Sequence, residues 1–256
     1  MTLNGFAGRT AFVTGAAGGI GKATVARLRE AGANVFATDL PDAIAALASA
    51  DDGTVWHALD VRDPSAVDDA VARAEARLGP LGLGVHAAGI VSNLSVLDTP
   101  PEEWARVMDI NAAGTFNTAR AMGAAMAGHK RGAIVVVSSN AAGIPRMNMG
   151  AYAASKAAAT MLTRCLGLEL AAHGVRCNIL APGSTLTPMQ TGMWADEQGA
   201  ARVVAGDPAS YRTGIPLAKL ATPEDVANAA MFLLSDEAGH VTMADLYVDG
   251  GATLRA

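Results

Sequence analysis

The amino-acid sequence predicts an α/β fold: a doubly wound, parallel sheet of seven strands with helices on both faces. Short apolar segments rich in β-branched residues alternate with Ala-rich amphipathic segments along the whole chain, which is typical of βαβ units. The chain has 256 residues, of which 51% are hydrophobic, so it can bury a large core. No linker, charge block or repeat divides the sequence, and we therefore expect a single domain over residues 1–256.

The predicted strands are segments that are too short and too apolar for surface helices. In chain order they are Thr10–Thr14, Asn34–Thr38, Thr54–Leu59, Gly84–Ala88, Ala133–Ser138, Val175–Leu180 and Leu246–Val248. Continuous apolar strands of this kind are buried on both faces of a parallel sheet. Helices are therefore expected in the connections between them.

Two of these predicted helices carry clear start signals. Asp63 can cap a helix with Pro64 at its first position, and apolar residues then recur at helical spacing until Gly79. Thr222, followed by the sequence Pro-Glu-Asp, opens a second helix in the same way. Neither helix carries residues that suggest chemistry.

The segment from residue 183 to about residue 216 breaks the alternation. It is rich in Gly, Ser, Thr and Pro, yet it contains Met189, Met193, Trp194 and Tyr211. Long irregular connections in compact domains are usually lids, binding loops or disordered segments. We expect a substrate lid here; the alternative is that its apolar residues plug a surface groove.

Composition and charge exclude several classes of function. A net charge of −5 gives no basic footprint for nucleic acid or for an anionic membrane surface. Cys165 and Cys177 form no CxxC pair and have no histidine cluster nearby, so neither a disulfide framework nor a metal site is indicated. The sequence has no secretory signal pattern, and no apolar run reaches the ~18 residues of a membrane span, so a cytoplasmic protein is expected.

A glycine-rich turn follows the first predicted strand directly. The sequence reads Thr-Gly-Ala-Ala-Gly-Gly-Ile-Gly from position 14 and leads into a helix that closes at Gly32. Glycines let a pyrophosphate approach the backbone closely, and the helix N-terminus offers free N–H groups and a favourable dipole. This context predicts a dinucleotide site that includes Gly15, Gly19, Ile20 and Gly21.

Asp39 stands after the second predicted strand, 18 positions beyond Gly21. A carboxylate there would accept hydrogen bonds from the adenosine ribose hydroxyls of NAD. The 2′-phosphate of NADP would instead meet like charge, and neither position 18 nor position 40 holds an Arg or Lys to receive it. Asp60 and Val61, after the third strand, could border the adenine, although Asp60 could equally serve helix entry.

Tyr152 and Lys156 stand four residues apart in an Ala-rich segment, so both side chains project from one face of a helix. A tyrosine hydroxyl has a reference pKa near 10, so its use as a base near pH 7 requires a shift of ~3 units, or about 4 kcal/mol. One positive charge at ~4 Å supplies about that much at an effective dielectric constant of ~20. We therefore expect Lys156, helped by an oxidised nicotinamide, to activate Tyr152 as a general base.

Two further polar residues complete a candidate catalytic set. Ser139 lies at the end of the fifth predicted strand, where open parallel sheets place ligand-contacting groups, and could orient a substrate alcohol. Asn111 follows the fourth strand and could hold a water that relays the proton to solvent. Either residue taken alone is better explained as a turn or cap residue, so only the set of four carries the argument.

Together these residues resemble the short-chain dehydrogenase/reductase family, whose pattern is a TGxxxGxG turn, an Asn, a Ser and a Tyr-x-x-x-Lys pair. The resemblance covers essentially the whole chain. It implies a Rossmann-like fold with Tyr152 as the catalytic acid/base and Lys156 also binding the nicotinamide ribose. It further implies that Ser139 positions the substrate oxygen and that Asn111 belongs to the proton relay.

The resemblance extends the cofactor site to three more segments. Pro182, Gly183 and Thr187 match the family segment that contacts the nicotinamide amide, and Asp-Gly-Gly from position 249 matches its usual C-terminus. The family usually has Asn-Asn-Ala-Gly after the fourth strand, whereas this chain reads His-Ala-Ala-Gly from position 86. Ala88 and Gly89 are assigned to the cofactor site, and the histidine can be a structural residue. The resemblance also implies a homotetramer formed through the Tyr152 helix and the C-terminal strand.

The second half of the chain resembles one branch of that family. The segments that carry this likeness are 145–149, 174–178, 182–185 and 214–217, with Met189, Gln190 and Trp194. The likeness implies NAD-dependent oxidation of a ring hydroxyl of a dihydro-dihydroxybenzoate-type cyclohexadiene carboxylate. The ketone then tautomerises to an aromatic catechol of siderophore biosynthesis.

The residues of that half permit such a substrate on physical grounds. The planar fork of Arg146 matches a carboxylate, although it could also be a solvated loop charge. Met147, Met149, Met189 and Trp194 could enclose a flat apolar ring, or the methionines could pack a subunit interface. Gln190 could contact a second ring hydroxyl.

Three alternatives stay open from the sequence. A 2,3-dihydro-3-hydroxyanthranilate, with an amine in place of one hydroxyl, would need nearly the same pocket. A carrier-protein-linked oxoacyl reductase would normally require NADPH and basic docking helices, which Asp39 and the net charge disfavour. A non-catalytic NAD-binding protein would have to keep Ser139, Tyr152 and Lys156 idle.

Overall fold

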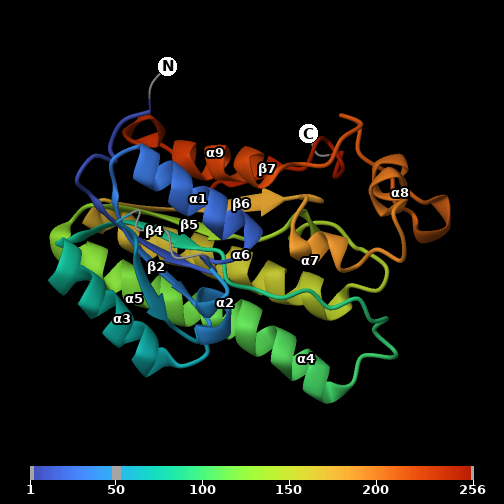
Figure 1. The fold of residues 1–256 in the computed structure, drawn as a ribbon, viewed down its shortest axis with the longest axis horizontal. Helices are drawn as coiled ribbons and strands as arrows, with labels where there is room; N and C mark the ends of the chain where they lie inside the picture. The colour runs from blue at the N-terminus through green and yellow to red at the C-terminus, as the bar shows by residue number, and fades with distance from the viewer. Residues whose placement is uncertain (1–2, 48–52, 255–256) are drawn as a thin grey trace.

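The computed structural model of the chain, which describes residues 3–47 and 53–254, contains one seven-stranded sheet (Figure 1). Every strand pairing is parallel, and the strand order is β3-β2-β1-β4-β5-β6-β7. The strands are β1 (Thr10–Thr14), β2 (Asn34–Asp39), β3 (Val55–Ala58), β4 (Leu81–His86), β5 (Gly132–Val137), β6 (Val175–Pro182) and β7 (Asp245–Val248). The predicted doubly wound parallel sheet is confirmed.

The main difference from the sequence-based expectation is the position of β4. The strand runs over Leu81–His86 rather than Gly84–Ala88. Its two glycines lie within the strand because neighbouring side chains fill their space: a Cβ on Gly82 would meet Arg9, and one on Gly84 would meet Met122. Close approach of other groups is one reason for glycine inside a strand.

The helices follow the strands as the alternating pattern predicts. They are α1 (Gly19–Glu30), α2 (Pro41–Ala45), α3 (Pro64–Leu78), α4 (Pro101–Met108), α5 (Gly114–His129), α6 (Gly150–Leu170), α7 (Pro188–Thr191), α8 (Gly199–Ala205) and α9 (Pro223–Leu234). Asp63 caps α3 by accepting from the backbone N–H groups of Ser65 and Ala66. Thr222 and Asp225 form a capping box on α9, so both predicted helix starts are confirmed.

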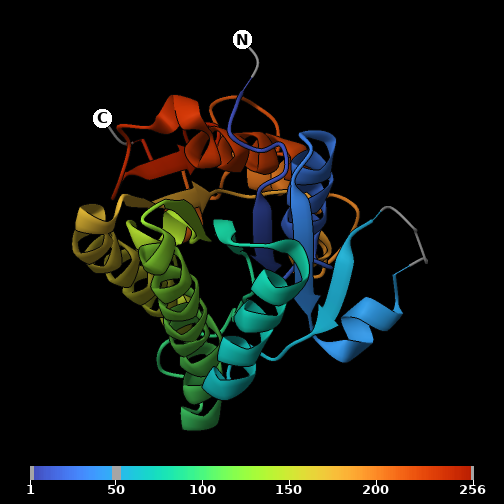
Figure 2. The same ribbon diagram turned by 90° about the vertical axis from the view of Figure 1, so that its left-hand side faces the viewer.

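Two helical layers cover opposite faces of the sheet. Helices α1 and α9 pack together on one face, and α3, α5 and α6 cover the other (Figure 2). Alternate residues of β1 accordingly enter different cores: Val13 packs in the core beneath α1 and α9, and Phe12 packs in the core beneath α3 and α5. Burial on both faces explains why the strands read as continuous apolar runs.

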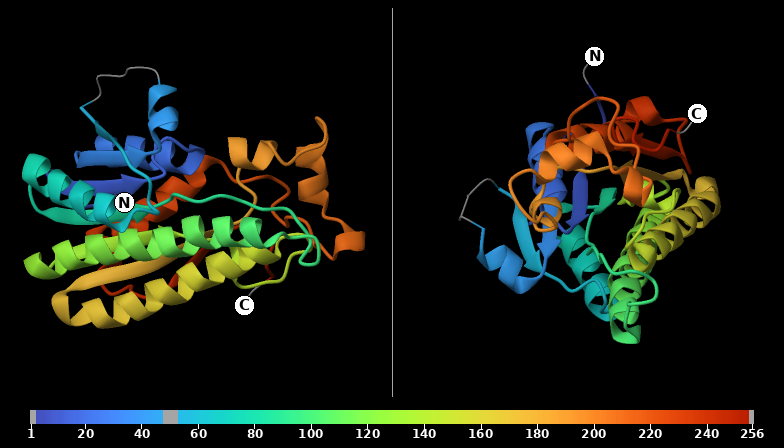
Figure 3. Two further views of the ribbon diagram at one scale, coloured as in Figure 1. Left: turned by 90° about the horizontal axis from the view of Figure 1, so that it is seen from below. Right: turned by 90° about the vertical axis from the view of Figure 1, so that its right-hand side faces the viewer.

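The segment 183–216 contains structure that its composition did not predict. It forms the short helices α7 and α8 and a 3-10 turn over Pro208–Ser210. These elements lie beyond the carboxyl end of β6, at the same end of the molecule as the connection that follows β4 (Figures 1 and 3). Across the described residues, no helix combines the length and the apolar character needed to cross a bilayer.

Candidate active site

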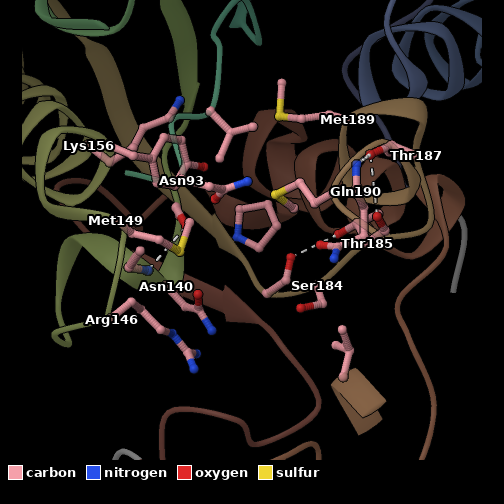
Figure 4. A pocket seen from close by; sticks show the side chains of 18 of the residues that line it. Asn93, Asn140, Arg146, Met149, Lys156, Ser184, Thr185, Thr187, Met189 and Gln190 are labelled. Atoms are coloured by element: carbon pink, nitrogen blue, oxygen red, sulfur yellow. Dashed lines mark hydrogen bonds between the residues drawn. The ribbon is translucent and has the colours of Figure 1, made fainter. Parts of the chain in front are cut away.

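A cavity of about 490 Å³ opens at the carboxyl ends of β4, β5 and β6 (Figure 4). Parallel α/β sheets bind their ligands at this edge. Fourteen residues that the sequence marked for cofactor, substrate or catalysis line it: Ile20, Gly89, Ser139, Arg146, Met147, Met149, Tyr152, Lys156, Pro182, Gly183, Thr187, Met189, Gln190 and Trp194. Residues up to 174 positions apart in the sequence therefore line one cavity.

Tyr152 and Lys156 lie one helical turn apart on α6 and face the same cavity. The Lys156 Nζ is 5.9 Å from the centre of the Tyr152 ring. It donates a hydrogen bond of 3.0 Å to the carbonyl of Val137, at the end of β5. Burial lowers the pKa of Lys156 to about 8, so its side-chain amine is still mostly protonated at neutral pH.

The acidity of the Tyr152 hydroxyl depends on its surroundings. Burial disfavours the phenolate and raises the pKa of the hydroxyl, while a hydrogen bond with Ser139 lowers it in part. The activation of Tyr152 by Lys156 together with an oxidised nicotinamide stays a prediction.

Ser139 lies between β5 and a single 3-10 turn, Asn140–Ala142. Its Oγ accepts a hydrogen bond of 3.1 Å from the backbone N–H of Ala141. This contact fixes the hydroxyl beside Tyr152, with only 8% of the residue exposed. Ser139 is thus placed to hold the oxygen of a ligand against the Tyr152 hydroxyl.

Asn111 lies in a π-helical turn, Asp109–Ala113, that joins α4 to α5. Its side chain is fully buried and spans two elements: Oδ1 accepts from the N–H of Ile90, and Nδ2 donates to the Ile90 carbonyl and to Ser155 Oγ. The amide therefore does not line the cavity. It fixes the chain after β4 to α6 beside Lys156, so its observed contacts position other groups, and its part in a proton relay stays a prediction.

The glycine-rich turn fits a pyrophosphate on structural grounds. Gly15 has a φ of +63°, and a Cβ there would lie 2.5 Å from the backbone nitrogen of Ala88. A Cβ on Gly19 would meet Thr187 at 2.7 Å, which brings the lid segment against the turn. Helix α1 begins after Gly18 without a side-chain cap, so its first N–H groups can receive an anion. Gly21 packs directly on Gly15 within the same turn.

Asp39 lies at the carboxyl end of β2, against this turn. Its Oδ2 accepts a hydrogen bond of 2.9 Å from the N–H of Ala17, and its Oδ1 accepts one of 2.8 Å from Leu40. A carboxylate has further lone pairs for ribose hydroxyls. The placement fits the adenosine end of a dinucleotide bound across the turn.

Asp60 and Val61 follow β3 and have partners of their own. The Asp60 carboxylate forms an ion pair with Arg62, whose Nη2 is 2.6 Å from Oδ2, and this contact lowers the pKa of Asp60. Val61 is buried, and its carbonyl accepts from Asn117. Neither residue lines the cavity, so their role beside an adenine stays a prediction.

The residues predicted for a substrate lie on two sides of the cavity. Arg146 and Met149 precede α6, whereas Met189, Gln190 and Trp194 come from the lid segment in and after α7 (Figure 4). Arg146 is partly buried, and burial, with a smaller effect from the charge on Arg212, lowers its pKa. The arrangement places a cation and two thioethers in the same cavity as Tyr152.

Several lining residues were missed from the sequence. Arg212, which comes from the far end of the lid segment, is the most important of them because it brings a second guanidinium into the cavity. The others include Asn93, Asn140 and Asp207. The isolated Arg between Tyr211 and a Thr-Gly pair gives no motif, so only the fold reveals it.

His86, which replaces the family's usual Asn, is fully buried at the end of β4. Its Nδ1 lies 2.9 Å from the Thr14 hydroxyl, and its Nε2 has no hydrogen-bond partner within the described part of the chain. Burial, with a smaller contribution from the charge on Lys156, lowers the pKa of His86 to about 3. The ring is therefore neutral and links β4 to the residue that begins the glycine-rich turn.

The segment after β7 is fastened to the active site. Asp249 is buried and accepts hydrogen bonds from Asn140 Nδ2, from the N–H of Gly251 and from both the N–H and the hydroxyl of Thr253. The Thr213 hydroxyl donates to the Ala252 carbonyl, which ties this segment to the lid as well. The turn that carries Ser139 and the lid thus share one support.

Comparisons with known proteins agree with this geometry. A family model described as Enoyl-(Acyl carrier protein) reductase matches residues 15–253. The 2,3-dihydro-2,3-dihydroxybenzoate dehydrogenase of Bacillus subtilis (strain 168) is 47% identical over 259 residues, covering 99% of each chain. The vibriobactin-specific 2,3-dihydro-2,3-dihydroxybenzoate dehydrogenase of Vibrio cholerae serotype O1 is 42% identical, covering 94% of this chain and 95% of its own.

A solved structure gives the same result for the fold. The crystal structure of gox2181 has a TM-score of 0.85 and 32% sequence identity to this chain, and the match covers 96% of each. Together with the Tyr152–Lys156 pair, the glycine-rich turn and the relatives above, it identifies the type of protein. The chain belongs to the short-chain dehydrogenase/reductase family of oxidoreductases.

Proposed function

We propose that the protein oxidises a ring hydroxyl of 2,3-dihydro-2,3-dihydroxybenzoate with NAD, giving 2,3-dihydroxybenzoate. The observation that carries this proposal is the Arg146 guanidinium in the same cavity as the Ser139 and Tyr152 hydroxyls. Among the described residues, Arg146 has no carboxylate partner in an ion pair. A partly buried cation in this position favours an anionic ligand, and the relatives named above act on a ring that carries a carboxylate.

Asp39 supports NAD as the cofactor. Enzymes of the family use NAD or NADP, and a carboxylate at the end of β2 would repel the 2′-phosphate of NADP. Gly15, Gly19 and the N-terminus of α1 would hold the pyrophosphate, and Thr187 would lie near the nicotinamide. When bound, oxidised NAD supplies the hydride acceptor and a positive charge beside the phenol.

The proton chemistry falls to Tyr152. Ser139 holds the substrate hydroxyl, and the Tyr152 phenolate takes up its proton as that carbon becomes a ketone. Lys156 provides a fixed positive charge one helical turn away, which opposes the effect of burial on the phenol. The ketone then shifts one ring proton and becomes the aromatic catechol.

The test supplies NAD and three cyclohexadienes: 2,3-dihydro-2,3-dihydroxybenzoate, 2,3-dihydro-3-hydroxyanthranilate and a cyclohexadiene diol without a carboxylate. We expect the first to be oxidised with the highest kcat/KM, followed by absorbance of the aromatic product. Faster oxidation of the amino alcohol would make the hydroxyanthranilate precursor the substrate instead. Oxidation of none of them by a protein that binds NADH would revive a non-catalytic role.

Two variants make the test specific. Arg146→Ala should raise KM for the carboxylated rings and leave the neutral diol nearly unchanged, because only the former lose an ionic partner. An equal effect on all three rings would contradict the carboxylate assignment. Tyr152→Phe should abolish turnover while NADH affinity changes by no more than a few-fold.

Two further proposals concern the lid and the assembly. Residues 183–216 place Met189, Gln190 and Trp194 over the cavity and are proposed to cover the bound ring. A homotetramer through α6 and β7 is proposed as well, supported by Met161 and Leu168, which are 55% and 69% exposed on α6. Light scattering of the purified protein would report the mass of the assembly.

A further inference from the structure

Arg212 reaches the cavity from a tightly folded part of the lid. Asp207 and Arg212 exchange two backbone hydrogen bonds, of 3.0 and 2.9 Å, and close the segment 206–214 into a loop. Gly206 and Gly214 have φ angles of +81° and +77° and pack against each other with no room for a Cβ. The loop therefore sets the direction in which Arg212 leaves the backbone.

The guanidinium of Arg212 has few partners of its own. Its Nη2 donates to Met149 Sδ at 3.5 Å, and a thioether is a weak acceptor. In the part of the chain that the structure describes, neither Arg212 nor Arg146 has a carboxylate oxygen within 4 Å. Most of the donors of both side chains are thus available to a ligand.

Two carboxylates lie in the neighbourhood, and both are engaged by uncharged donors. Asp207 accepts from the Ser210 hydroxyl at 2.6 Å and from the N–H of Ala209 at 3.0 Å. Asp249 accepts from Asn140, Gly251 and Thr253, as described above. They moderate the positive potential of the cavity but do not pair with either arginine.

Two guanidinium groups of like charge in one cavity repel each other. Arg146 and Arg212 line the same cavity, and the charge on Arg212 contributes, after burial, to the lowered pKa of Arg146. A carboxylate placed between the two guanidinium groups would attract both of them, which offsets their mutual repulsion. It could also accept bidentate hydrogen bonds from them. A neutral ring would leave the repulsion in place.

We propose that Arg146 and Arg212 bind the carboxylate of the substrate together, and that this shared contact draws the loop 206–214 onto the ring. The inference rests on the proposed function, since it takes a ring carboxylate as the ligand. Arg146 precedes α6 and lies beside the catalytic helix, whereas Arg212 belongs to the lid. Substrate binding and lid closure are then coupled through one anion, and rings without a carboxylate bind to an open site.

The experiment measures binding of two aromatic probes by calorimetry in the presence of NADH. The probes are 2,3-dihydroxybenzoate and catechol, which differ only in the carboxylate. Arg212→Met should weaken the binding of 2,3-dihydroxybenzoate by about 10- to 100-fold and the binding of catechol by less than about threefold. Arg212→Lys keeps the charge and should retain most of the preference for the carboxylated probe.

Arg202→Met is the matched control. Arg202 is also a lid arginine, but it pairs with Asp196 on the surface, with Nη2 2.8 Å from Oδ1. We expect this variant to bind both probes as the unaltered protein does. Hydrogen exchange should show that 2,3-dihydroxybenzoate protects the loop 206–214 in the unaltered protein and not in Arg212→Met.

Equal weakening of both probes in Arg212→Met, or no weakening of either, would overturn the inference. Should Arg212→Met not fold, the Lys variant decides, because loss of the carboxylate preference there would also overturn it. Measurement of turnover distinguishes a failure of this inference from a failure of the proposed function. Dihydrodiol oxidation with unchanged kcat/KM in Arg212→Met defeats only the inference, whereas Arg212-dependent binding by a protein that oxidises no ring defeats only the proposed function.

Discussion

The Lys156 ammonium lies 5.9 Å from the centre of the Tyr152 ring and is held there by a hydrogen bond to the Val137 carbonyl. The strand β5 thus fixes the cation, and the helix α6 fixes its distance from the phenol. Burial acts on both groups in opposite senses: it raises the pKa of Tyr152 and lowers that of Lys156 to about 8. Burial thus disfavours the charged form of each group and moves the two pKa values apart.

The pH dependence of oxidation follows from these shifts. Because the phenolate is the base and its pKa is raised, kcat/KM should increase with pH through neutrality, by up to about tenfold per pH unit. Lys156→Met removes a charge that stabilises the phenolate by roughly 3 kcal/mol at an effective dielectric constant of ~20. The increase in kcat/KM should therefore occur about two pH units higher in this variant. A pH–rate profile of both proteins checks this, and coincident profiles would remove Lys156 from the electrostatics of the base.

Cofactor preference should depend on the charge of Asp39. Asp39→Asn keeps an oxygen that can accept from the Ala17 N–H and removes the negative charge that a 2′-phosphate would meet. We expect kcat/KM for NADP to increase and that for NAD to fall, each by about tenfold. Steady-state kinetics with both nucleotides measure the change. An unaltered ratio would show that Asp39 does not face the ribose.

Substitution of Gly15 should weaken cofactor binding more than it weakens the fold. Gly15→Ala places a Cβ against the backbone of Ala87 and Ala88 and strains a residue with φ +63°. NADH affinity should fall at least tenfold in a fluorescence titration. Gly128→Ala is the matched control, since nothing lies within 4 Å of its Cβ in α5. Equal NADH affinity in the two variants would contradict the pyrophosphate site.

His86 should make the fold sensitive to acid. Its folded pKa is about 3, below the ~6.5 of an unfolded histidine, so between these values only the unfolded chain takes up the proton. The contribution of His86 to the free energy of unfolding is complete above about pH 6.5. It is lost as the pH falls toward 3, at up to ~1.4 kcal/mol per pH unit.

The variant His86→Asn should show a shallower fall in the free energy of unfolding between pH 7 and pH 5, measured with urea. His240→Asn, which alters an exposed histidine, serves as the control and should keep the original slope. A slope that His86→Asn leaves unchanged would mean that the unaltered histidine takes up its proton without unfolding.

Local spacing was sufficient to predict much of the site. Tyr152 and Lys156 lie four residues apart on one helix, and the glycine-rich turn directly follows the strand Thr10–Thr14. Both features depend on residues that are close in the sequence, so the sequence alone predicts them. Arg212 lies 60 positions beyond Tyr152 and lines the same cavity because the segment 206–214 closes into a loop. No periodicity in the sequence predicts that arrangement.

Electrostatic environment was the other property that the sequence could not supply. The raised pKa of Tyr152 reflects its burial by the surrounding protein, which a linear pattern of residues does not record. The position of β4 was missed for a related reason. Gly82 lies outside the predicted strand and resembles a turn residue until Arg9 is seen to occupy its space.

The support of the lid by the segment after β7 bears on how the protein can be handled. Asp249, Ala252 and Thr253 connect the Ser139 turn to Thr213, so an affinity tag or reporter fused behind them would sit beside the entrance for the ring. The described residues ahead of β1 lie away from that entrance, toward the other end of the sheet (Figure 1). Fusions for immobilisation or imaging are therefore best made ahead of β1, where they leave the catalytic edge unobstructed.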